Sequence, residues 1–117
     1  MKIKFSLPYK AQWGEMLCVN LTFHSSRGAS QDVKLLMSTQ DGYHWMVETS
    51  TRENRQHPFD LIYYYYTVVD DDGKVLRTES VDSPRVYVYD SSKSYIFDDF
   101  WLEEKLAARM ATSIGRT

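Results

Sequence analysis

The sequence is poor in cysteine, proline and glycine: its 117 residues include one, three and five of them, respectively. The single cysteine, Cys18, excludes an intrachain disulfide, and a chain of this length can bury enough surface to fold as one domain without one. A lone thiol is typical of a reducing compartment, so we expect a cytoplasmic protein. Because the three histidines lie in separate segments without ligand spacing, we expect no metal site and no cofactor.

An excess of charge of either sign is also missing. The formal net charge is -2, and acidic and basic residues are interspersed, which gives nucleic-acid binding little electrostatic support. No apolar run approaches the roughly 18 residues of a membrane span. Residues 1–5 enter an alternating strand pattern directly, where a signal peptide would need an apolar run. We therefore expect neither nucleic acid nor a membrane as a partner.

Known catalytic motifs are absent from the sequence. It contains no glycine-rich phosphate loop, no Gly-x-Ser-x-Gly elbow and no His-Glu-x-x-His helix. Asp70–Asp72 is an acidic run, but no bidentate glutamate follows at the EF-hand distance, which favours a hairpin tip over a calcium site. No acid–base pair is evident either, so we expect that this chain is not an enzyme by itself.

Aromatic residues, in contrast, are abundant: they make up 15% of the sequence and include nine tyrosines. A small domain rarely needs so many rings for its core, so we expect several at the surface, where they indicate a binding face. In the run Tyr63–Tyr66, successive side chains of a strand point to opposite sides. If Tyr64 and Tyr66 face the core together with Ile62 and Val68, then Tyr63 and Tyr65 face outward.

Alternating apolar residues between turn signals indicate β-strands along most of the chain. About seven short strands of this kind predict an all-β, antiparallel β-sandwich. They fall at residues 2–7, 16–23, 33–37, 45–49, 59–69, 74–78 and 85–89. The end of the sequence differs: residues 98–110 carry an apolar helical stripe that Asp98 or Asp99 can cap, which predicts a short C-terminal helix.

Four segments, in this order, resemble family 20 carbohydrate-binding modules, the starch-binding domains. Residues 13–19 are similar to the family's aromatic-Gly-Glu strand, and residues 41–47 to its central tryptophan strand. Residues 62–76 are similar to its tyrosine-rich hairpin, and residues 84–88 to its closing strand. The resemblance covers about residues 2–90 and implies an immunoglobulin-like sandwich.

The resemblance implies a function as well as a fold. It implies a module that binds α-1,4-glucan, such as starch, glycogen or maltooligosaccharide, without catalysing a reaction. With residues 97–101 after it, the module resembles the first of two tandem modules before the catalytic barrel of certain 4-α-glucanotransferases. Residues 1–92 are then the module, and residues 93–117 a helix or a linker toward the following domains of the parent protein.

The resemblance also points to glucan-binding residues. In the family's second glucan site, the aromatic residue before Gly-Glu is Trp13 here, and the aromatic residue before the central tryptophan is Tyr43. Aromatic rings stack on the C–H faces of sugars, and they supply contact area at low entropic cost. Glu15, His44 and Gln12 are expected to bond sugar hydroxyls at the edges of these rings.

The family's first glucan site is altered in this sequence. Its loop tryptophan is missing near residues 27–30, its second tryptophan falls near Arg77, and its lysine falls on Tyr65, which we keep as a candidate glucan contact. Three alternatives to glucan binding therefore stay open. One is a degenerate module with a structural or protein-interaction role, one is a glycogen-sensing subunit of related fold that recruits a partner protein, and one is an enzyme with an unrecognised site.

Overall fold

The computed structural model describes residues 2–25, 28, 30–50, 60–79, 85–90 and 93–102. Nine strands lie in this part of the chain, and no helix within it could cross a membrane. The strands are β1 (Lys2–Pro8), β2 (Met16–His24), β3 (Ser30–Leu36), β4 (Ser38–Thr39), β5 (His44–Ser50), β6 (Leu61–Val69), β7 (Val75–Thr78), β8 (Arg85–Val88) and β9 (Tyr95–Asp98).

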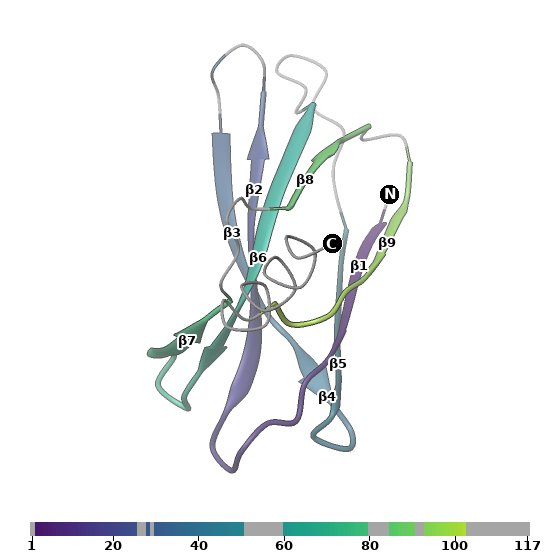
Figure 1. Cartoon of the computed structure of the whole chain (residues 1–117). Coiled ribbons are helices and arrows are strands. Elements are labelled where there is room, and N and C mark those ends of the chain that lie inside the picture. The colour runs from purple at the N-terminus through teal and green to yellow at the C-terminus, as the bar shows by residue number, and fades with distance from the viewer. Residues whose placement is uncertain are drawn as a thin grey trace, which may run out of the picture.

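Two sheets face each other and enclose the core (Figure 1). Sheet A has the order β4-β5-β1-β9, and sheet B has the order β3-β2-β6-β7. Strand β8 also pairs with β6, on the same edge as β7: β8 contacts the first half of β6, and β7 contacts the second half. The predicted all-β sandwich is confirmed, as is the hairpin of β6 and β7. One pairing in the described residues departs from the antiparallel prediction, because β9 runs parallel to β1.

The core follows from the alternation of apolar residues along the strands. Because successive side chains point to opposite faces, every second residue of β1, β2 and β6 turns toward the opposite sheet. Trp45 of β5 is part of this core, and its side chain is 5% exposed. The other core residues are Ile3, Phe5, Leu7, Leu17, Val19, Leu21, Phe23, Met37, Ile62, Tyr64, Tyr66, Val68 and Tyr89.

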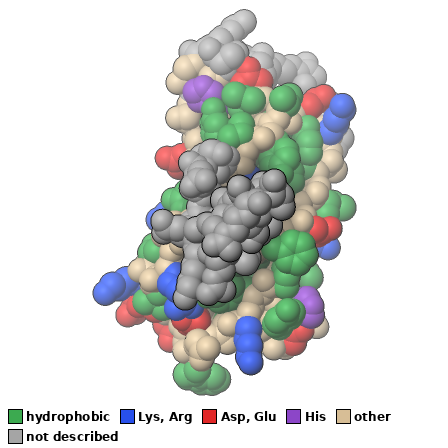
Figure 2. All heavy atoms as spheres, in the orientation of Figure 1, with side chains coloured by type: hydrophobic (Ala, Val, Ile, Leu, Met, Phe, Trp, Pro, Cys, Tyr) green, Lys and Arg blue, Asp and Glu red, His purple; other side chains and the backbone are tan. Residues whose placement is uncertain are grey.

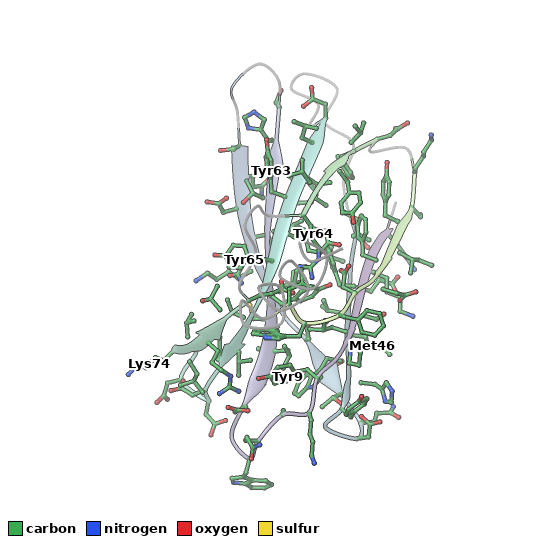
Figure 3. The ribbon with its side chains drawn as sticks, in the orientation of Figure 1. Tyr9, Met46, Tyr63, Tyr64, Tyr65 and Lys74 are labelled. Carbon is green, nitrogen blue, oxygen red and sulfur yellow. The ribbon has the colours of Figure 1, made fainter. Side chains whose placement is uncertain are left out.

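The tyrosine run of β6 alternates as predicted. Tyr64 and Tyr66 are buried, whereas Tyr65 is 38% exposed, and Figure 3 shows Tyr64 and Tyr65 on opposite sides of the strand. The Tyr64 ring packs edge-on against the Phe5 ring of sheet A, with 4.9 Å between the centroids. Edge-to-face ring pairs of this kind add about 0.5–1.5 kcal/mol beyond the area they bury, so β6 helps to hold the two sheets together.

A buried ion pair lies along the β6 edge of sheet B, where Glu79, the residue after β7, meets Arg85, the first residue of β8. Arg85 Nη2 donates to Glu79 Oε2 at 2.7 Å, and the Glu79 side chain is 0% exposed. The Glu79 carboxylate also accepts hydrogen bonds from the backbone N–H groups of Tyr66 at 3.1 Å and Leu102 at 3.0 Å. The donors to this carboxylate come from three segments: β6, β8 and the residues after β9. The Glu79 carboxylate therefore links these segments through charge-assisted hydrogen bonds.

The same cluster continues to Asp99, the residue after β9. Asp99 Oδ2 accepts hydrogen bonds from the hydroxyls of Tyr64 at 2.8 Å and Tyr66 at 2.7 Å, and its Oδ1 lies 3.5 Å from Arg85 Nε. Arg85 Nη2 donates further to the backbone oxygen of Phe100 at 3.0 Å. Burial, together with the Asp99 carboxylate, raises the pKa of both tyrosines, so their hydroxyls stay protonated as donors.

The C-terminal end of the described chain differs from the prediction. Asp98 is the last residue of β9, and residues 99–102 are neither helix nor strand. The two aspartates cap no helix here: Asp98 accepts a hydrogen bond from Ser6, and Asp99 from the two tyrosines. Residues 103–110 of the predicted helix lie outside the described residues. Sheet A also extends beyond residue 92, where the module was expected to end, because β9 pairs with β1.

Replacing Trp45 with alanine should cost about 3–5 kcal/mol of unfolding free energy, because it leaves a core cavity. It also removes the hydrogen bond from Trp45 Nε1 to the backbone oxygen of Tyr9 at 3.0 Å. Urea denaturation followed by circular dichroism measures the loss. The neighbouring exposed Met46→Ala is the control and should change stability by less than about 0.5 kcal/mol. An unchanged midpoint for Trp45→Ala would contradict the register of β5.

The variant Arg85→Met should lose about 3–5 kcal/mol, because it leaves the Glu79 carboxylate buried without its cation. The matched control is Lys93→Met. It breaks an ion pair with Asp90 in which both side chains are exposed, and it should be close to neutral. Chemical denaturation of both variants distinguishes the two sites. Equal, small effects would show that the cluster does not hold sheet B to the segment after β9.

Candidate functional site

Two loops meet at one end of the sandwich, the connection between β1 and β2 and the turn between β4 and β5. Backbone hydrogen bonds join them: Tyr9 N donates to Tyr43 O at 2.8 Å, and Ala11 N donates to Gly42 O at 3.2 Å. Both loops lie at the lower end of Figure 1, and a hydrophobic side chain projects from that end of the surface in Figure 2. Charges of both signs are interspersed over the face that Figure 2 shows.

Trp13 stands at the tip of the first loop. Its side chain is 104% exposed, which means that the rest of the described chain covers none of it. The turn beneath it is closed by a hydrogen bond from Glu15 N to Gln12 O at 3.0 Å, with Gly14 at a φ of 83°, a conformation that favours glycine. The predicted exposure of Trp13 is therefore confirmed, and its backbone position is fixed by a tight turn.

Glu15 holds this turn rather than projecting from it. Its Oε1 accepts a hydrogen bond from Gln12 N at 2.7 Å, and its Oε2 lies 2.6 Å from Arg77 Nη2. Burial raises the pKa of Glu15, but the bonds from Gln12 and Arg77 outweigh it, so the pKa lies below its ordinary value. Both carboxylate oxygens are thus engaged by the protein, and the structure gives Glu15 a positioning role.

Arg77 ties the Trp13 turn to sheet B. Besides Glu15, it donates from Nε at 3.0 Å and from Nη2 at 2.8 Å to the hydroxyl of Tyr9, and it lies over that ring at 5.8 Å. The Tyr9 ring in turn packs against Trp101, with 4.9 Å between the centroids. The resemblance places a tryptophan of the first glucan site near Arg77. In this structure, Arg77 instead fixes the loop that carries Trp13.

Asp41 holds the second loop. Its Oδ1 accepts from the backbone N–H groups of Tyr43 and His44, both at 2.8 Å, and its Oδ2 lies 2.7 Å from His44 Nδ1. The His44 ring packs edge-on against the Tyr43 ring, with 4.8 Å between the centroids. Tyr43 is 47% exposed, so one residue fixes an exposed ring and its histidine neighbour together.

The structure therefore brings four of the predicted residues to one end of the molecule: Trp13, Glu15, Tyr43 and His44. Trp13 is two residues beyond the Ala11–Gly42 hydrogen bond, and two residues of chain span at most about 7 Å. Gln12, also exposed, lies in the same turn. The arrangement offers two accessible ring faces with polar groups at their edges, on loops that are pinned by hydrogen bonds, and it suits a ligand with alternating apolar faces and hydroxyls.

Tyr65 lies elsewhere. It pairs with Asn20 in the middle of sheet B, four residues along β2 from its first residue Met16, a distance of roughly 13 Å along the strand. Its ring is on the outer face of that sheet and has no place in the Trp13 cluster. Any contact between Tyr65 and glucan would form a separate site, so this candidate stays a prediction.

Two positioning residues were missed in the sequence. The dipeptide Asp41-Gly42 gave a turn signal, but the signal does not say that the carboxylate also orients His44. Arg77 gave no local signal, because its partner Glu15 is 62 positions away in the chain. Only the pairing of β6 with β7 brings Arg77 to the end of the sandwich where Trp13 lies.

Comparison with known proteins agrees with the fold. No protein-family model matches the sequence, and a comparison with curated proteins finds no match. Among solved structures, the chain is similar to Glycoside Hydrolase Family 15 Glucoamylase from Hypocrea jecorina, with a TM-score of 0.57 and 15% identity over 87% of this chain and 17% of that one. It is also similar to Gamma-CGTase from alkalophilic Bacillus clarkii, with a TM-score of 0.54 and 13% identity over 87% and 15%. At these identities the likeness is one of fold, and the chain spans only a small part of either structure.

The Asp41 carboxylate should stay ionised, and keep its hydrogen bonds, to a lower pH than an ordinary aspartate would. Hydrogen bonds from the backbone and side chain of His44 and from the Tyr43 N–H hold the pKa of Asp41 well below its ordinary value of 3.8. A depressed pKa means that the stabilising contribution is complete above 3.8 and is lost only as the pH falls through the lower, folded value. In ¹H–¹⁵N spectra, the Tyr43 and His44 amide signals should therefore show no carboxylate titration between pH 6 and about pH 3 beyond that of Asp41→Asn. A midpoint near 3.8 that disappears in Asp41→Asn would contradict these hydrogen bonds.

Proposed function

We propose that this domain is a non-catalytic carbohydrate-binding module for α-1,4-glucan, in starch, glycogen or maltooligosaccharides. The observation that carries the proposal is the fully exposed indole of Trp13 on a hydrogen-bonded turn beside Tyr43. A ring that is fixed in this way supplies a large contact area at low entropic cost, which is typical of the aromatic anchors of binding sites.

Rigid presentation of the rings favours binding. The Trp13 turn is held by Glu15 and Arg77, and the Tyr43 turn by Asp41, so little backbone freedom is lost when a ligand binds. Two rings set at an angle to each other would suit a curved α-1,4-linked chain better than a flat one. The hydroxyls at the sugar edge then meet polar groups such as those of Gln12 and His44.

The structural neighbours support glucan as the ligand class. Both are enzymes of starch, a glucoamylase and a CGTase, and the chain matches 17% and 15% of their lengths. Together with the motifs that resemble family 20 modules, this supports a domain that holds glucan near a catalytic domain on the same parent chain. Tethering of this kind raises the effective concentration of substrate without any chemistry by the module itself.

For the parent protein, we propose a cytoplasmic 4-α-glucanotransferase, following the resemblance to its N-terminal modules. The partners of the domain are then α-glucan and the following domains of that parent. A reducing compartment suits Cys18, which is buried in β2, and whose burial raises the pKa of its thiol. We expect neither nucleic acid nor a membrane among the partners of this domain.

A second function, a structural or protein-interaction role, is favoured by other exposed residues. Apolar side chains are exposed on β8, on β9 and in the segment after β9: Val86, Val88, Ile96 and Phe100. Exposed apolar residues on sheet edges are a common site of contact with another domain. None of them lies in the Trp13 loop, so the two functions can be tested independently.

Replacing Trp13 with alanine should remove most glucan binding and leave the fold intact. One ring pair covers two or three sugars, so we expect a dissociation constant between about 1 mM and tens of micromolar, or roughly 4–6 kcal/mol. Truncating the aromatic anchor should cost about 2 kcal/mol or more, a roughly 30-fold loss. Isothermal titration calorimetry with maltoheptaose measures it, and the melting temperature should stay within about 1–2 °C because the ring is fully exposed.

Two control variants locate the effect. Phe100→Ala removes a ring that is 74% exposed in the segment after β9, and Tyr65→Ala removes the ring on the outer face of sheet B. Both should keep the wild-type affinity of the Trp13 site. Wild-type protein that does not respond to millimolar maltoheptaose would reject the binding module and favour the structural role. Full binding by Trp13→Ala would reject this site.

A further inference from the structure

A hollow lies beside the Tyr43 turn, on the outer side of the β4–β5 hairpin. Its volume is about 470 Å³, which falls within the roughly 300–1,000 Å³ of small-molecule sites. Met46 of β5 is 44% exposed there, and Figure 3 shows it on the sheet A side of the molecule. The lining residues are Ser38, Thr39, Gln40, Asp41, His44 and Met46.

The hollow combines one apolar side chain with a polar rim. Ser38 Oγ donates to Met46 O at 3.3 Å, which leaves its lone pairs able to accept. Gln40 is exposed and makes no hydrogen bond with the described residues, so both its amide oxygen and its amide nitrogen are available. This mixture of donors and acceptors around an apolar floor suits a sugar ring.

His44 links the hollow to the Tyr43 ring. Its Nδ1 lies 2.7 Å from Asp41 Oδ2, and a carboxylate partner favours the proton on Nδ1. The opposite nitrogen, Nε2, is then left to form a hydrogen bond with a sugar hydroxyl. Because the Tyr43 and His44 rings are in contact, a ligand on Tyr43 reaches the hollow by passing one side chain.

The strand order gives the direction of this path. β5 lies between β4 and β1, and the loop that carries Trp13 follows β1, so the hollow and Trp13 lie on opposite sides of the Tyr43 turn. We infer that the hollow is an additional sugar subsite, in which an α-1,4-glucan bound on Trp13 and Tyr43 continues past His44 onto Met46 and Gln40. The inference rests on the proposed function and extends it: the preferred ligand is a chain longer than the rings alone can cover.

Chain-length dependence tests the subsite. Calorimetry compares maltotriose, which the ring pair can hold alone, with maltoheptaose, which can also reach the hollow. The wild-type protein should bind maltoheptaose about tenfold more tightly. Gln40→Ala removes hydrogen bonds to the added sugars and should lower the affinity for maltoheptaose about three- to tenfold, with maltotriose unchanged. Met46→Arg fills the hollow from an exposed position and should have the same selective effect. Gln31→Ala, an exposed glutamine on β3 of the other sheet, is the matched control.

The outcomes separate this inference from the proposed function. If maltoheptaose has no advantage, or if both variants retain it, the hollow is not a subsite, while a Trp13→Ala variant that loses maltotriose still supports the module. If wild-type protein binds neither sugar, both proposals fail. A loss confined to maltoheptaose in Gln40→Ala and Met46→Arg, with Gln31→Ala unaffected, supports the subsite.

Discussion

The sandwich depends on the buried ion pair between Glu79 and Arg85. The Glu79 side chain is 0% exposed, and a charge in that position is tolerated only because a guanidinium and two backbone N–H groups compensate for lost water. Arg85 also contacts Asp99 and Phe100, so one cation joins β8 to the segment after β9. Because that segment follows directly after β9, which pairs with β1 in sheet A, the cluster links the two sheets.

The candidate site is built on this fixed frame by a short chain of contacts. Trp45 is buried in sheet A, and its indole N–H binds the backbone of Tyr9, whose hydroxyl accepts from Arg77 of sheet B. Arg77 then holds Glu15, and Glu15 closes the turn that presents Trp13. Rigid strands thus place an exposed ring on a loop, which is the usual division of roles between scaffold and binding surface. A substitution at any of these links would act on the ligand through the position of the Trp13 turn.

Much of the fold could be predicted from the sequence, because apolar alternation reports directly which face of a strand is buried. This alternation predicted the strands β1, β2 and β6 and the alternating sides of the tyrosines in β6. It failed for β9, a strand of four residues, since Asp98 and Asp99 before an apolar stripe look like a helix start, whereas here they bind Ser6 and the buried tyrosines. In the site, the aromatic residues at turns and the exposure of Trp13 could be predicted, but the role of Arg77 depends on its contact with the distant Glu15, which no local pattern contains.

The most direct measurement of the central claim uses the three tryptophans of the chain, each of which gives one indole N–H signal in a ¹H–¹⁵N spectrum. Trp13 is exposed at the loop, Trp45 is buried, and Trp101 packs on Tyr9. On titration with maltoheptaose, the account predicts a saturable shift of the Trp13 indole signal together with the Tyr43 amide, while the Trp45 signal stays in place. A titration in which the Trp13 signal does not move, or in which the saturable shifts map to the outer face of sheet B around Tyr65, would contradict it.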